Sequence, residues 1–260
     1  MRFVRILLFC TFIANTSSAE AFQTSSVRLR ATFRLPSADG HARITRVAGG
    51  VHIQAEFSDM KPASLFGGDY NTYVFWGITD RGVSVNLGEL LLVGDKSELD
   101  VTTKTAISAL VITAEPHFLV AAPSRFVVLE YSAEGEPVEF KPGEARYNYE
   151  RDTLAKAPEA GDPVPTGLQQ AWTAVLLAQR AKADELASSE MGTANAALDE
   201  LLKLSKQGED RLALDEQARE TVRLAVAAQR KAREEEIAQL SRAGREARAS
   251  AKARAAGSIK

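Results

Sequence analysis

The stretch Tyr73-Val74-Phe75-Trp76-Gly77-Ile78 is apolar at every position. A strand with one solvent-facing side alternates apolar and polar residues, whereas a strand that is covered on both sides need not. We therefore expect this run to be a strand in the middle of a β-sandwich, with Trp76 in its core. An exposed Trp76 that stacks on a carbohydrate is the alternative.

Short runs with the character of strands lie on both sides of this stretch. Val27, Leu29, Ala31 and Phe33 alternate with polar residues, which predicts a strand with one basic, wet face. Gly49-Gly50, followed by the alternating residues 51–57, is typical of a tight hairpin. Further strands are expected around residues 42–44, 83–87, 90–93, 99–103, 109–114 and 126–131. Their connections are too short for crossover helices, so residues 22–131 are predicted to form an antiparallel β-sandwich.

Residues 132–165 differ in composition, because they are acidic and rich in proline and glycine. Proline fixes φ and removes a hydrogen-bond donor, so this segment is predicted to be a linker between two domains. Phe140, Tyr147 and Tyr149 are placed to dock part of the linker onto the sandwich.

From residue 166 to residue 240 the apolar period becomes helical. Thr166 and Gln169 have the spacing of a capping box, and Gly192 is expected to interrupt or kink the first long helix. Gly208 is placed as a C-terminal cap and Asp210 as the cap of the next helix. These signals predict an Ala-rich antiparallel helical hairpin or three-helix bundle that serves as a spacer or as a self-association element, and so allows a homo-oligomer.

Residues 241–260 are predicted to form a basic helical tail without a large apolar face. Such a tail can contact anionic lipid, lipopolysaccharide or an acidic cell-wall polymer, and the alternative is a frayed, solvated end. The residues proposed for this contact are Arg242, Arg245, Arg248, Lys252 and Arg254.

Residues 1–21 have the features of a cleaved signal peptide: Arg2 and Arg5, an apolar run at 6–14, and small residues before Glu20 and Phe22. The run is shorter than a spanning helix requires. Cys10 is the sole cysteine, but it does not fit a lipoprotein signal, because such a signal needs a small residue where this chain has the bulky Phe9. We therefore expect a periplasmic or envelope-associated protein whose mature form has no thiol.

Two stretches resemble the extracytoplasmic β-domain of anti-sigma-K factors. One is the Tyr-x-x-Trp strand at 73–76 with the hairpin at 80–88, and the other is the strand at 109–116, which ends Val-Ile-Thr-Ala-Glu-Pro. The chain looks closer to bacterial envelope proteins in which such a domain precedes an Ala-rich helical domain of unknown function. Some of these end in a peptidoglycan-binding domain like that of outer-membrane protein A. The sequence shows neither that domain nor a sigma-binding segment, so sigma-factor sequestration is not expected.

The composition and motifs indicate a non-enzymatic binding or scaffold protein. The net charge of −2, with both signs abundant, does not mark a nucleic-acid binder. His41, His52 and His117 have no metal-ligand spacing, and no Gly-x-Ser-x-Gly elbow is present, so no catalytic residue, metal or cofactor is expected. The expected partner is an envelope protein or a cell-wall component. A carbohydrate- or solute-binding module is the alternative, and a hydrolase is a remote one.

Overall fold

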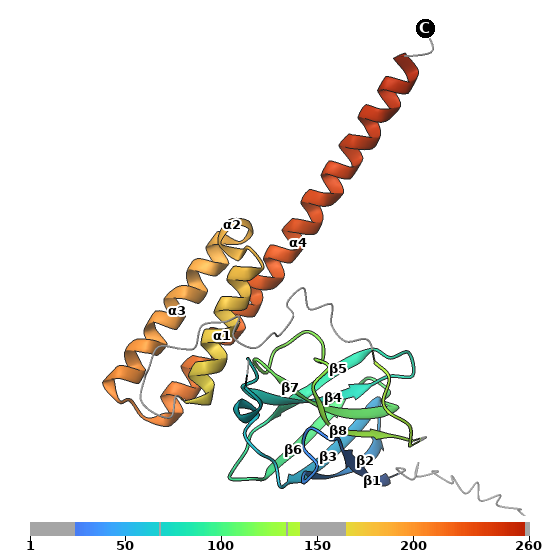
Figure 1. Ribbon diagram of the computed structural model, residues 1–260, viewed down its shortest axis with the longest axis vertical. Helices are drawn as coiled ribbons and strands as arrows, with labels where there is room; N and C mark the ends of the chain where they lie inside the picture. Colours follow the sequence, from blue (N-terminus) through green and yellow to red (C-terminus); the bar gives the residue numbers. More distant parts are fainter. Residues whose placement is uncertain (1–23, 68, 134, 141–164, 258–260) are drawn as a thin grey trace, which may run out of the picture.

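A computed structural model of the protein describes residues 24–67, 69–133, 135–140 and 165–257 (Figure 1). The expected signal peptide and most of the expected linker lie outside these residues. The described chain has a β-rich part, residues 24–140, and a helical part, residues 165–257.

The β-rich part is an eight-stranded antiparallel sheet that folds over into a sandwich of two layers (Figure 1). One layer has the order β1-β2-β3-β6, and the other has the order β5-β4-β7-β8. Residues 24–29 of β1 pair with β2, whereas Arg30 and Ala31 pair with β8, so β1 joins the two layers. The strands are β1 (Thr24–Ala31), β2 (Asp39–Val47), β3 (Gly50–Ser58), β4 (Thr72–Ile78), β5 (Ser84–Leu90), β6 (Ser97–Thr103), β7 (Ala109–Glu115) and β8 (Val127–Ser132), with one 3-10 turn, η1 (Ala63–Phe66).

The sandwich has the predicted centre. Every residue of β4 and β7 is buried. Their inner faces contribute to the main core between the layers, which includes Phe75 and Leu110. On the outer face, Trp76 packs in a smaller cluster that Phe140 helps to cover, as expected for both residues. The Trp76 indole N–H donates to Thr113 Oγ1 at 2.8 Å, so this tryptophan is a core residue and has no free face for a carbohydrate.

Two details of the predicted strands are wrong. Phe33 continues the alternation of the first strand, but β1 ends at Ala31 and Phe33 is 83% exposed in the turn that follows. Residues 90–93 do not form a separate strand: Leu90 ends β5, and Val93 is 83% exposed in the following loop. In both places the apolar pattern continues after the chain has left the sheet. The predicted hairpin at Gly49-Gly50 is confirmed, because Val47 pairs with Gly50.

The helical part is a bundle whose two longer early helices both pack on the first half of the last one (Figure 1). Its helices are α1 (Thr166–Arg180), α2 (Ala183–Leu186), α3 (Ser188–Gln207) and α4 (Arg211–Gly257). Ten of its sixteen buried core residues are alanines. The small side chains allow the helix backbones to approach closely.

The predicted ends of the helices are partly right. Gly208 adopts a left-handed conformation (φ 71°) after α3, and the Asp210 carboxylate accepts from the N–H groups of Leu212 and Ala213. The capping box at Thr166 is not formed, because Thr166 is already the first helical residue. Gly192 lies inside α3 and does not end it. The helical conformation is instead interrupted near Lys182, whose φ is 61°.

Candidate functional site

The most prominent surface feature is the second half of α4, which extends away from the bundle (Figure 1). Ala232 is the last buried residue of this helix among those whose side chains the structure describes. We call residues 233–257 the arm. At 1.5 Å per residue this segment is about 37 Å long.

The arm carries the residues that the sequence indicated. Arg242, Arg245, Arg248 and Arg254 are all exposed. Lys252 lies in the same helix, but its side chain is outside the described residues. Because α4 is a single unbroken helix, it holds these cations in one rod rather than in a folded pocket.

Charge is unevenly distributed along the arm. The end next to the bundle has three consecutive acids, Glu234 to Glu236, and the distal end is basic. Glu235 is paired with Lys231 at 3.0 Å, and a hydrogen bond from Lys231 lowers the pKa of Glu235. In the described part of the chain, Arg245, Arg248 and Arg254 form no ion pair. The distal arm is therefore free to meet an anionic partner.

A buried polar cluster fixes the helical part to the sandwich. Glu89, at the end of β5, has a side chain that is only 5% exposed. Its Oε1 accepts from Thr72 Oγ1 and from Gln170 Nε2, both at 2.7 Å, while its Oε2 pairs with Arg219 of α4. Both carboxylate oxygens have partners, so Glu89 holds α1 through Gln170 and α4 through Arg219 on the sandwich.

The loop after β7 completes this junction. Phe118 packs against the helical core, and the Arg219 guanidinium lies over its ring at 4.7 Å from the centroid. The backbone N–H of Phe118 donates to Gln170 Oε1 at 3.0 Å. Asn71 Nδ2 donates both to the Pro116 carbonyl and to Thr173 Oγ1 of α1. Sequence reasoning missed this cluster, because its members lie in separate segments that come together only on docking.

Two buried ionisable groups lie beside the junction. The Glu115 carboxylate accepts from Thr113 Oγ1 and from the Ser124 N–H through Oε1, while Oε2 has no partner among the described residues. Burial raises the pKa of Glu115 to about 7 and lowers the pKa of His117 to about 4. His117 Nδ1 also has no partner within the described chain. Both side chains are covered by protein, so neither can contact a dissolved substrate.

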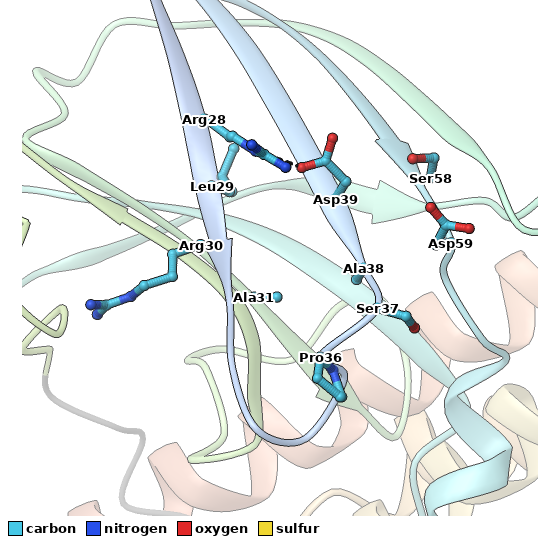
Figure 2. Close-up of a pocket in the computed structure, with 10 residues that line it drawn as sticks. All are labelled: Arg28, Leu29, Arg30, Ala31, Pro36, Ser37, Ala38, Asp39, Ser58 and Asp59. Atoms are coloured by element: carbon cyan, nitrogen blue, oxygen red, sulfur yellow. Dashed lines mark hydrogen bonds and ion pairs between the residues drawn. The ribbon is translucent and has the colours of Figure 1, made fainter.

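A shallow hollow between β1 and the turn before β2 is shown in Figure 2. Its two arginines are already paired. Arg28 points toward Asp39 and binds it at 2.8 Å, and Arg30 turns away to Glu130 at 2.6 Å. This hollow therefore has no unpaired charge on these arginines to offer a ligand.

The other two histidines lie on the sandwich surface. His52 Nε2 lies 2.7 Å from Asp100, and His41 Nδ1 lies 3.3 Å from Asp39. The described residues contain no group of three or more His, Cys, Asp or Glu side chains that is placed to hold a metal ion. None of the described helices has the length and apolar composition needed to cross a membrane.

No protein-family model, curated protein or solved structure matches this chain. The resemblance to the anti-sigma-K β-domain therefore stays a prediction from the sequence.

Proposed function

We propose that this protein is a non-enzymatic, envelope-associated binding and scaffold protein whose arm contacts an anionic surface or polymer. The observation that carries the proposal is the arm itself: a helix that leaves its bundle and carries exposed arginines with no acidic partner in the described chain. The proposed envelope location rests on the signal-peptide features of residues 1–21.

The rest of the fold supports a scaffold role. The junction at Glu89 and Arg219 joins the sandwich to the first half of α4, and the arm continues that same helix. A partner on the sandwich and a surface at the arm would thus be held at a defined separation. The sandwich would supply the recognition of an envelope protein or cell-wall component.

The physical basis of the contact is electrostatic. A basic side chain close to an anionic surface contributes about 1 kcal/mol, and the contribution falls within a Debye length. Most helical stability in proteins comes from tertiary packing, and no described residue of the arm is buried, so an anionic partner would also favour the helical form of the arm.

The test is cosedimentation of the protein with anionic vesicles and with peptidoglycan sacculi at low and high salt. The triple variant Arg245→Gln, Arg248→Gln, Arg254→Gln is expected to bind on the order of a hundredfold more weakly at low salt. The control variant Arg43→Gln, Arg46→Gln, Arg81→Gln makes the same change of charge on the sandwich surface. Equal binding of both variants and the unaltered protein would refute the proposal.

Deletion of residues 241–260 provides a second test. Nothing in this segment is buried among its described residues, so the deletion should leave thermal stability almost unchanged while it removes surface binding. If the deletion unfolds the helical part, the tail belongs to the packed domain instead.

A carbohydrate- or solute-binding module is the second candidate function, and the exposed ring of Phe33 is the observation that favours it. A glycan screen with Phe33→Ala as the comparison tests this candidate. A hit that the substitution abolishes would favour it over the scaffold.

A further inference from the structure

The arm has an exposed apolar face that no described residue of the chain covers. Ile237 and Leu240 are 62% and 63% exposed, although both are large apolar residues. Gly244, Ala247 and Ala251 continue the same face at alternating spacings of four and three. This spacing is the heptad pattern of a two-helix seam, with its large residues at one end and small ones at the other.

The charges beside this face follow a matching order. Glu234 and Arg248 occupy equivalent heptad positions on the same flank, two heptads apart, and both are exposed. In a parallel pair of arms the acidic segments would lie together and the basic segments would lie together. In an antiparallel pair, each Glu234 would lie beside the Arg248 of the other copy, and opposite charges would meet twice.

We propose that the arms of two copies of this chain pair side by side in opposite directions, with Glu234 of each beside Arg248 of the other. The proposal goes beyond the proposed function: it takes up the self-association that the sequence predicts for the helices, and it names the partner as a second copy.

Packing favours the same orientation. In the antiparallel register, Ile237 lies opposite Ala247 and Leu240 lies opposite Gly244, so each large side chain meets a small one. A parallel pair would place Gly244 against Gly244 and leave space between the helices. The two-fold axis would pass near Arg242, and the interface would be isologous.

The pairing leaves other cations available. Arg242 and Arg245 lie at outer positions of the heptad, so they stay free for the anionic surface of the proposed function. The paired length, about residues 233–251, is short, so we expect a weak dimer that forms with rising concentration.

Sedimentation of the mature protein, which is the background for each variant, over a range of concentrations tests the pairing. Glu234→Arg alone and Arg248→Glu alone should each weaken dimerisation by about tenfold, because each turns two attractions into repulsions. The double variant Glu234→Arg, Arg248→Glu restores both pairs and should dimerise like the background protein. Circular dichroism establishes that each variant is folded.

Cysteine crosslinking tests the direction. Ser241→Cys lies close to the two-fold axis, so a short bis-maleimide should join two copies. The two copies of Ala251→Cys would be about 27 Å apart along an antiparallel pair and should not be joined. Equal crosslinking at both positions would show a parallel pair and overturn the proposal, as would a monomer at all concentrations or a double variant that fails to recover.

These experiments distinguish a failure of the proposed pairing from a failure of the proposed contact with an anionic surface. Glu234→Arg disrupts the proposed pairs but keeps every arginine of the proposed surface contact, so its binding to anionic vesicles should be no weaker than that of the background protein. A background protein that binds vesicles but does not dimerise would overturn only the pairing. Dimerisation without vesicle binding would overturn only the proposed contact with an anionic surface.

Discussion

The sandwich and the helical part bury their cores in different ways. Five of the eighteen residues in the main sandwich core are alanines, against ten of sixteen in the helical core. A large buried side chain contributes about 1.5–3 kcal/mol through the area that it removes from water, and an alanine contributes much less. The sandwich is therefore held by side-chain volume, and the bundle by close approach of its helices.

This difference in packing explains how the first half of α4 can belong to the core of the bundle while its second half projects from it. The first half of α4 is held because α1 and α3 approach it closely, and Ala218, Ala225 and Ala232 lie at that contact. Past Ala232 no described residue of the helix is buried. The protein thus has a sandwich with a core of large side chains, a helical bundle with a core of mostly alanines, and a helix that projects from that bundle.

Truncation of a large side chain should have its greatest effect in the sandwich. Trp76→Ala removes a fully buried indole from the outer cluster and leaves a cavity, so the free energy of unfolding should fall by about 3–5 kcal/mol. Urea denaturation followed by circular dichroism measures the loss. The control is Phe33→Ala, an exposed aromatic, which should change stability by about 0.5 kcal/mol or less. Similar effects of both variants would mean that Trp76 does not anchor the core.

The next largest effect should separate the two regions from each other. Arg219→Met leaves Glu89 Oε2 buried without a partner, which should cost about 3 kcal/mol. The loss should appear as undocking of the helical part, with two unfolding transitions in place of one. Arg223→Met is the matched control, since Arg223 lies one turn further along α4 and forms only an exposed pair with Glu220. Adding Glu89→Gln to Arg219→Met should recover part of the stability; no recovery would contradict a role for the ion pair.

Several elements of the fold could be predicted from the sequence, because each depends on residues that are close together in the chain. The fully apolar run of β4 and the Gly49 hairpin depend on residues that are neighbours in sequence. The capping of α4 by Asp210 is equally local. The end of β1 and the break near Lys182 could not be predicted, since each depends on where distant segments pack. Neither position has a glycine or proline that would indicate the break.

The candidate site shows the same limit. The basic residues of the arm are visible as a biased run of sequence, and the structure places those that it describes along one exposed helix. Glu89 and Arg219 are 130 residues apart, and no local pattern joins them. Glu115 and His117 carried a weak signal, an acid and a histidine flanking Pro116 at the end of an apolar run, but burial was needed to recognise them.

The pH dependence of stability should sharpen the contrast further, because the buried groups Glu115 and His117, whose pKa values are shifted, are both in the sandwich. Burial raises the pKa of Glu115 in the folded protein to about 7, above the ordinary value of 4.5. The contribution of protonated Glu115 to the free energy of unfolding is therefore fully present below pH 4.5, and it is lost as pH rises through 7. Glu115→Gln should remove that loss and stabilise the protein at pH 8 by roughly 2–3 kcal/mol relative to the unaltered chain. Urea denaturation from pH 5 to pH 8 measures the difference.

His117 acts in the opposite direction and supplies the control. Its folded pKa, about 4, lies below 6.5, so stability falls as pH drops from 6.5 toward 4. In Glu115→Gln only this slope should remain, and the curve should be flat above pH 6.5. A variant that still loses stability between pH 6.5 and pH 8 would show that another group causes the loss.

The smallest expected effect comes from adding volume to the helical part. If the bundle depends on close approach, a larger side chain at a buried alanine should push the helices apart. Ala228 is fully buried, and Ala228→Leu should lower stability by about 1–3 kcal/mol through overpacking, although leucine is the more hydrophobic residue. Ala249→Leu makes the identical change on the exposed arm of the same helix and should leave unfolding unaltered. Thermal melts of both variants make the comparison. If Ala228→Leu stabilises the protein, the bundle has room for larger side chains, and close approach is not what holds it.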